Sequence, residues 1–316
     1  MSWTGLPPAV AWSAVGILAV LMVASITLAV LRRARPDTDF TELGQRIRSW
    51  WVMAIVFTVA VLVDRTVSLV FLGFTSFLAL KEYLSIIPTR RADRRVLFWA
   101  YLAIPAQYLW VGMEWYGMFI VFIPVYMLLL LPLPMLVIGR TEGFLRAVGT
   151  LHWGLMMTVF SLSHMAFLLV LPGPGGGAEN DPGGAGLLLF LVLLTQFNDV
   201  AQYLWGKLLG RRPVIPRVSP NKTVEGLIGG VLTTVVLAAL LAPWLTPFAL
   251  PAALGMGALI GLAGFAGDIS VSALKRDMGI KDSGGLLPGH GGILDRLDSL
   301  TYTAPLFFHV TRYFFF

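Results

Sequence analysis

The chain has 316 residues, of which 57% are hydrophobic and only 13% are charged, and its formal net charge is +6. That much apolar side chain exceeds what one soluble core of this length can bury, and the mean hydropathy of +0.79 excludes an ordinary soluble globular protein. The sequence contains no cysteine, which excludes a disulfide framework and thiolate catalysis. We therefore expect an all-α, polytopic integral membrane protein.

Ten apolar stretches are candidates for transmembrane helices, each of which needs about 20 apolar residues. In chain order they are residues 9–31, 50–63, 66–86, 96–113, 117–138, 147–171, 186–206, 225–243, 248–267 and 299–316. Because the second is short and the last contains Arg312, nine and ten spans both stay open. The first stretch is too long, and lacks the flanking signals, to be a removable signal peptide, so we expect it to be a permanent span.

Basic residues predict the orientation, since Lys and Arg accumulate in cytoplasmic loops. If the first span runs inward, the inner loops contain all 23 Lys and Arg residues except Arg65 and Arg312. We therefore place the protein in a bacterial inner membrane with its polar loops facing the cytoplasm. Basic loops beside anionic lipid head groups also explain the net charge without a nucleic-acid partner.

The chain divides near residue 185 into two parts of different character. Residues 1–185 alternate apolar spans with short or Arg-rich loops, and we expect them to be N-terminal transmembrane helices without a reaction centre. Residues 186–316 contain three polar patches in succession, so we expect this part to be the catalytic region.

The first polar patch lies at the inner end of the seventh span. On a helix Asp199, Gln202 and Tyr203 fall within one turn on the same face, so the carboxylate and the amide could face a common cavity. A carboxylate within a membrane span indicates a functional site by default, although pairing with a Lys or Arg of a neighbouring helix is the structural alternative.

The second patch runs from Ser219 to Gly226 and reads SPNKTVEG. Ser219 and Pro220 fit a helix start, Glu225 suits the first turns, and free backbone N–H groups beside Lys222 could meet a phosphate. Helix capping alone would produce the same string, so both interpretations stay open.

The third patch, from Asp268 to Asp298, is the most densely charged. If the ninth span continues as helix past Gly267, then Asp268, Ser272 and Lys275 lie at i, i+4 and i+7 on one stripe, with Arg276 at its edge. A carboxylate, a hydroxyl and a cation would then line one wall of a site.

A Gly-rich turn over residues 284–292 separates this wall from Asp295 and Asp298, which we expect at i and i+3 on the next helix with Arg296 pointing elsewhere. Carboxylates from two helices suit Mg²⁺, which proteins bind through one or two acidic residues together with substrate phosphates. Positioning and electrostatic stabilisation carry most of the rate in phosphoryl transfer. A site for such a reaction therefore does not need a Ser-His-Asp arrangement, which this sequence lacks.

The four histidines have different settings. His290 lies between glycines that would let the backbone approach a ligand closely, with a structural turn as the alternative. His152, His164 and His309 lie in apolar spans, where we expect hydrogen bonds between helices.

At these positions the chain resembles the phosphatidate cytidylyltransferases, also called CDP-diacylglycerol synthases. Their signature, S-x-x-K-R, four residues, K-D, a turn, then H-G-G-x-x-D-R-x-D, is matched by Ser272, Lys275, Arg276, Lys281, Asp282, His290, Gly291, Gly292, Asp295, Arg296 and Asp298. Their S-P-x-K-T-x-E-G string is matched by Ser219 to Gly226. At the first patch the family often has Asp-Thr-Gly-Ala-Tyr, of which only Asp199 carries over, and this indicates a divergent branch.

The resemblance implies transfer of the cytidylyl group of CTP to phosphatidic acid, with Mg²⁺ as cofactor and a monovalent cation as a further candidate. We expect Asp268 and Asp295 to act in catalysis as metal ligands, supported by Asp298 and Asp199, together with Lys275 and Arg276. The substrate-binding candidates are Ser219, Lys222, Ser272, Lys281, His290 and Arg296.

Two alternatives stay open. A CTP-dependent lipid kinase acting on a polyprenol would use the same groups to transfer the γ-phosphoryl group. A transporter would bind a coupling ion at Asp199 and Asp268, but the charges gather at the cytoplasmic ends of spans rather than at inverted repeats near the midplane. We expect membrane lipids as partners and no nucleic acid, and a homodimer is one option for the oligomeric state.

Overall fold

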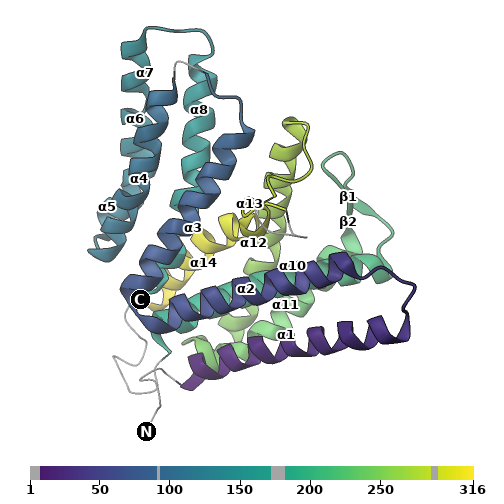
Figure 1. The fold of residues 1–316 in the computed structure, drawn as a ribbon. Coiled ribbons are helices and arrows are strands. Elements are labelled where there is room, and N and C mark those ends of the chain that lie inside the picture. The colour runs from purple at the N-terminus through teal and green to yellow at the C-terminus, as the bar shows by residue number, and fades with distance from the viewer. Residues whose placement is uncertain (1–7, 91–92, 172–181, 286–290) are drawn as a thin grey trace.

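A computed structural model describes residues 8–90, 93–171, 182–285 and 291–316, and these are almost entirely helical (Figure 1). The first helices are α1 (Pro8–Ala34), α2 (Thr41–Val63), α3 (Arg65–Ile86) and α4 (Arg94–Gly112). Two helical runs interrupted by π-helical turns (η) follow. The first consists of α5 (Tyr116–Val121), η2 (Phe122–Met127), α6 (Leu128–Leu130) and α7 (Pro132–Ile138). The second consists of α8 (Phe144–Leu155), η3 (Met156–Phe160) and α9 (Ser161–Leu168). The last elements are α10 (Gly183–Leu209), β1 (Pro213–Ile215), β2 (Ser219–Thr223), α11 (Val224–Leu245), α12 (Leu250–Asp277), α13 (Leu294–Leu297) and α14 (Leu300–Phe315).

This architecture confirms the all-α, polytopic membrane fold. Within the described residues, seven helical runs are long and apolar enough to cross a bilayer: α1, α3, α5–α7, α8–α9, α10, α11 and α12. The other three predicted spans fall on α2, α4 and α14, which are helices but do not belong to that set. The protein is therefore an integral membrane protein, and the number of nine or ten spans stays a prediction.

Close helix packing in the C-terminal part depends on glycine. Helix α11 packs along both α10 and α12, and α14 packs against α12 and α9. A Cβ atom on Gly257 would lie 2.8 Å from Val235 Cα, and one on Gly230 would lie 2.3 Å from Gln202 Cγ. Small residues at such positions let helices approach closely in a membrane, where apolar burial no longer favours association over lipid contact.

One sequence prediction about local structure is wrong. Ser219 and Pro220 do not start a helix, because residues 219–223 form β2 and pair antiparallel with β1. Helix α11 begins after Thr223, whose hydroxyl accepts a hydrogen bond from Gly226 N at 3.1 Å. The predicted first-turn carboxylate of Glu225 accepts hydrogen bonds from the backbone N–H groups of Arg211 and Arg212, and so ties the base of the hairpin to α11.

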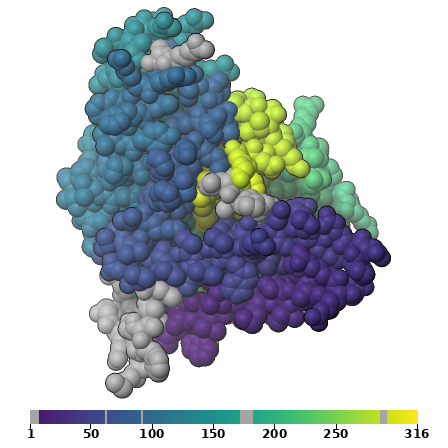
Figure 2. Space-filling model, viewed as in Figure 1, coloured from purple at the N-terminus to yellow at the C-terminus, as the bar shows by residue number. Residues whose placement is uncertain are grey.

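The segment after α12 lies where the N-terminal and C-terminal helices meet. Helix α13 contacts α3, although they are far apart in the sequence. In the space-filling view the yellow-green atoms of this region lie in a hollow between the blue N-terminal helices and the green hairpin (Figure 2). The most charged part of the sequence is thus placed between elements from both halves of the chain.

The prediction for the membrane histidines is confirmed in part. His164 Nε2 lies 3.2 Å from His309 Nε2 of α14, and His164 Nδ1 lies 2.8 Å from the carbonyl oxygen of Phe160. The buried Nδ1 of His152 has no hydrogen-bond partner within the described residues.

Candidate active site

Helix α12 continues for ten residues beyond Gly267, ending at Asp277, and so confirms the predicted stripe. Ser272 Oγ donates a hydrogen bond to Asp268 Oδ1 at 3.2 Å, one turn away. Arg276 lies at the edge, where its Nε donates to the carbonyl of Val218 at 3.2 Å. Asp268 and Ser272 therefore form a wall that Arg276 connects to the β1–β2 turn.

Lys222 connects the second patch to this wall. Its Nζ, from β2, forms an ion pair with Asp268, and about a fifth of each side chain is exposed. The same ammonium group lies 5.2 Å from the centre of the Phe265 ring. The second and third patches, which are separate in the sequence, thus meet at Asp268.

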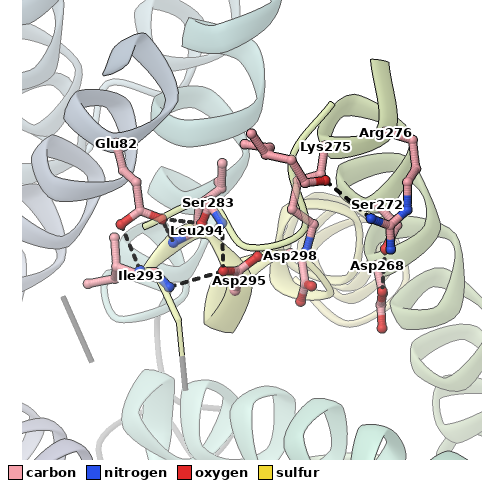
Figure 3. A network of polar contacts seen from close by, with 12 residues as sticks. Glu82, Asp268, Ser272, Lys275, Arg276, Ser283, Ile293, Leu294, Asp295 and Asp298 are labelled. Atoms are coloured by element: carbon pink, nitrogen blue, oxygen red, sulfur yellow. Dashed lines mark hydrogen bonds and ion pairs between the residues drawn. The ribbon is translucent and has the colours of Figure 1, made fainter. Parts of the chain in front are cut away.

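Asp295 lies on the other wall and accepts three hydrogen bonds (Figure 3). Lys275 Nζ donates to its Oδ1 at 2.7 Å, and the backbone N–H groups of Ser283 and Gly292 donate to its Oδ2 at 2.9 and 3.0 Å. Burial alone would raise the pKa of Asp295, but these hydrogen bonds outweigh burial and leave that pKa below its usual value. Asp295 is therefore a buried carboxylate that stays ionised.

Asp298, Asp199 and Asp268 form a group of interacting carboxylates. Asp298 follows the single turn of α13 in helical conformation, as the i, i+3 spacing predicted, and it is buried. Burial and the charges of Asp268 and Asp199 together raise the pKa of Asp298 well above its usual value. Ser299 connects two members, since its N–H donates to Asp298 Oδ1 at 2.7 Å and its hydroxyl donates to Asp199 Oδ1 at 3.0 Å.

A glycine and an asparagine hold this carboxylate group in place. A Cβ on Gly267 would lie 2.4 Å from the carbonyl oxygen of Asp298, so only glycine lets α12 approach that backbone. The buried Asn198 of α10 donates to the carbonyl of Gly261 on α12 at 3.3 Å and accepts from Thr234 on α11 at 3.1 Å. These contacts fix the turn of α10 that carries Asp199.

Some predicted residues lie elsewhere. Tyr203 is 63% exposed and lies beside Lys207, whereas Gln202 is buried between α10 and α11. Lys281 is exposed, Ser219 is partly exposed in β2, and His290 lies outside the described residues.

Arg296 was expected to point away from the carboxylates. Its positive charge is near enough to act on Asp298, where it opposes the rise in that pKa. Its buried Nε has no hydrogen-bond partner in the described part of the chain.

Glu82, a carboxylate near the C-terminal end of α3, was not among the predicted site residues. Its side chain accepts hydrogen bonds from the Ser283 hydroxyl and from the backbone N–H groups of Ile293 and Leu294, the latter two at 2.9 and 3.0 Å (Figure 3). The rule that marks a carboxylate at the end of an apolar span as functional could have found it. The expectation that residues 1–185 only supply membrane helices overlooked this contribution.

The described residues contain no group of three or more His, Cys, Asp or Glu side chains arranged to hold a metal ion. They do provide pairs of neighbouring carboxylates. Mg²⁺ is commonly bound by one or two carboxylates when substrate phosphates complete its coordination. The arrangement therefore joins buried carboxylates with Lys and Arg side chains, a combination suited to a polyphosphate and a divalent cation.

Comparisons with known proteins agree with this chemistry. The sequence is 46% identical over 297 residues to the uncharacterised protein YnbB of Escherichia coli (strain K12), covering 94% of this chain and 96% of that protein. It is 49% identical over 147 residues to the phosphatidate cytidylyltransferase of Pseudomonas aeruginosa, covering 45% of this chain and 54% of that protein. For the phosphatidate cytidylyltransferase of Staphylococcus aureus (strain COL) the identity is 38% over 129 residues, covering 40% of this chain and 50% of that protein.

The matches to named enzymes thus span about half of each relative's length. Most of the chain, residues 44–314, matches the profile of the cytidylyltransferase family. The chain belongs to the cytidylyltransferase family.

Proposed function

We propose that the protein transfers the cytidylyl group of CTP to phosphatidic acid at the cytoplasmic face of a bacterial inner membrane. As a cytidylyltransferase family member it is a nucleotidyltransferase, and two relatives that match part of it are named for phosphatidate. The observation that carries the proposal is a pair of cation–carboxylate contacts along the polar end of α12: Lys222 pairs with Asp268, whose charge acts on Asp298, and Lys275 pairs with Asp295. We assign this end of α12 to the cytoplasmic face. A nucleotide site in that position is within reach of both a soluble triphosphate and a lipid phosphate.

The reaction needs little covalent chemistry from the protein. An oxygen of the lipid phosphate attacks the α-phosphorus of CTP, a new P–O bond forms, and the bond to the leaving pyrophosphate breaks. Positioning and charge stabilisation carry such an in-line displacement. Positive charge for the phosphates comes from Lys222, Lys275 and Arg276. Arg296 is a further candidate for substrate contact, because its buried Nε has no hydrogen-bond partner among the described residues. Ser219, Ser272, Lys281 and His290 stay candidates for substrate contact.

The carboxylates fit Mg²⁺ by their chemistry. Asp268 and Asp295 each hold a lysine ammonium group, so both positions already stabilise a cation. Burial and mutual repulsion raise the pKa of Asp298, and the charge of a divalent ion would favour the ionised forms of Asp298 and Asp199. We assign Asp268 and Asp295 as the ligands, supported by Asp298 and Asp199. When bound, Mg²⁺ would neutralise charge on the phosphates, and Lys222 and Lys275 would then be available to phosphate oxygens.

A label-transfer assay tests the proposal. Purified protein is incubated with phosphatidic acid, Mg²⁺ and CTP labelled at either the α- or the γ-phosphorus. The proposed reaction places α-label in the lipid and γ-label in pyrophosphate, whereas a kinase acting on a polyprenol would place γ-label in the lipid. No labelled lipid from a folded wild-type protein would refute the function, and full activity of Asp295→Asn would refute its metal assignment.

A further inference from the structure

Glu82 lies in a position that the proposed chemistry does not use. It comes from α3, more than 200 residues before the segment that it contacts. Ile293 N donates to its Oε2 at 2.9 Å, Leu294 N donates to its Oε1 at 3.0 Å, and the Ser283 hydroxyl donates to the same Oε1. Both oxygens of one carboxylate are thus occupied by donors from one short segment.

The same segment is held from its other side by Asp295. The Ser283 residue donates its hydroxyl to Glu82 and its backbone N–H to Asp295. Gly292 N also donates to Asp295, while the next two N–H groups, those of Ile293 and Leu294, donate to Glu82. Two carboxylates therefore bind both Ser283 and the backbone of residues 292–294, as Figure 3 shows for the residues it labels.

The glycines of the H-G-G string fit this arrangement sterically. A Cβ on Gly292 would lie 1.8 Å from Glu82 Oε1 and 2.4 Å from Ser283 Oγ, so no larger residue fits between them. Gly291 has a φ of +80°, and a Cβ there would lie 2.7 Å from Asp295 Oδ2. One glycine thus makes room for Glu82 and the other for Asp295.

Charge-assisted hydrogen bonds of this kind are stronger and more directional than neutral ones. Leu294 directly precedes Asp295, so the bond from Leu294 N to Glu82 constrains the backbone that carries the Asp295 side chain. Asp295 in turn binds Lys275 of α12 at 2.7 Å. A chain of contacts therefore runs from Glu82 of α3 through Leu294 and Asp295 to Lys275 of α12.

We propose that Glu82 is a positioning residue, whose carboxylate clamps Ser283 to the backbone of Ile293 and Leu294 and thereby orients Asp295 and Lys275 for the reaction. The role in the reaction rests on the proposed function, whereas the clamping of these residues does not. The N-terminal helices then contribute to the reaction by holding the site from outside the signature segment.

Glu82→Gln tests the clamp with almost no change in size. An amide keeps one acceptor oxygen but turns an N–H₂ donor toward backbone N–H donors, so at least one bond to Ile293 or Leu294 is lost. Glu42→Gln is the matched control, because Glu42 is exposed on α2 and forms an ion pair with Arg46, one turn along the same helix and far in sequence from the signature segment. Both variants are made in the full chain and reconstituted in lipid nanodiscs.

Two measurements are made on each variant. Hydrogen–deuterium exchange should be faster in Glu82→Gln for peptides covering residues 291–298, with α1 and α11 unchanged. In the cytidylyl-transfer assay we expect kcat to fall about 100-fold, the effect typical of displacing a reacting group by about 1 Å, while KM for CTP changes about threefold or less. Glu42→Gln should match wild type in both measurements.

A second variant keeps the test decisive should Glu82→Gln fold poorly. Ser283→Ala removes one donor to the same carboxylate, so its kcat should fall about tenfold, and the double variant should be no worse than Glu82→Gln because the two groups act as one unit. Wild-type exchange in residues 291–298 of both Glu82→Gln and Ser283→Ala would overturn the clamp. An unchanged kcat with faster exchange would overturn the positioning role. An inactive wild type would defeat the proposed function, and the exchange data would still decide the clamp.

Discussion

Lys275→Met measures how much the Lys275–Asp295 ion pair contributes to the free energy of unfolding. The two side chains are 11% and 5% exposed, so solvent screens their interaction little. Losing one partner of a buried pair typically costs about 3–5 kcal/mol, and a hydrogen bond to a charged group contributes about 1.5–3 kcal/mol. Since Asp295 keeps its two backbone donors, we expect Lys275→Met to lower the free energy of unfolding by about 2–3 kcal/mol.

The double variant Lys275→Met/Asp295→Asn removes the buried charge as well as its partner. Replacing both members of a buried ion pair is often close to neutral, so we expect the double variant within about 1 kcal/mol of wild type. Unfolding is followed by tryptophan fluorescence during titration of mixed micelles with sodium dodecyl sulfate. Lys281→Met, at an exposed lysine of the same segment, should change stability by about 0.5 kcal/mol or less.

The Lys275–Asp295 interaction is refuted if the losses of unfolding free energy from Lys275→Met and Asp295→Asn simply add in the double variant. Additivity would mean that the two side chains do not interact in the native protein. Cytidylyl transfer should be lost in the single and double variants alike, so stability and activity respond differently to the second substitution.

Two further predictions concern helix packing and orientation. Gly267→Ala should destabilise the protein by about 1–3 kcal/mol, because the added Cβ would lie 2.4 Å from the carbonyl oxygen of Asp298. Gly255→Ala is the control on the same helix: its Cβ would enter open space, so the variant should be as stable as wild type or more stable. Thermal unfolding of the two variants measures the difference in stability. The chain has no cysteine, so Lys281→Cys and Glu114→Cys give single labelling sites without further changes. In inside-out vesicles a membrane-impermeant maleimide should label position 281 and spare position 114, and the opposite pattern would reverse the assigned topology.

Contacts within one helix were predictable from the sequence. The alignment of Asp268, Ser272 and Lys275 needs only the helical repeat and a helix that continues past Gly267, and both are present. The apolar stretches likewise predicted the helices, since a bilayer requires each spanning segment to satisfy its own backbone hydrogen bonds.

Contacts between distant segments were not predictable in this way. Ser219 and Pro220 look like a helix start locally, but pairing with residues 213–215 makes them a strand. Glu82 reads as one carboxylate in an apolar span, and its partners lie more than 200 residues away. Tyr203 shares a helix face with Asp199 in an ideal projection, yet the packing of α11 against α10 leaves it exposed.

Helix α12 also limits how this protein can vary in length. Its glycine-lined half is wedged against α11 and the Asp298 backbone, while its polar half carries Asp268 and Lys275 on the same uninterrupted helix. Inserting or deleting one residue between these halves would turn everything beyond it by about 100°, and would rotate Asp268 away from Lys222 and Lys275 away from Asp295. Among homologues, gaps should therefore be absent from residues 257–275 and tolerated in the surrounding loops, whatever lipid each protein accepts.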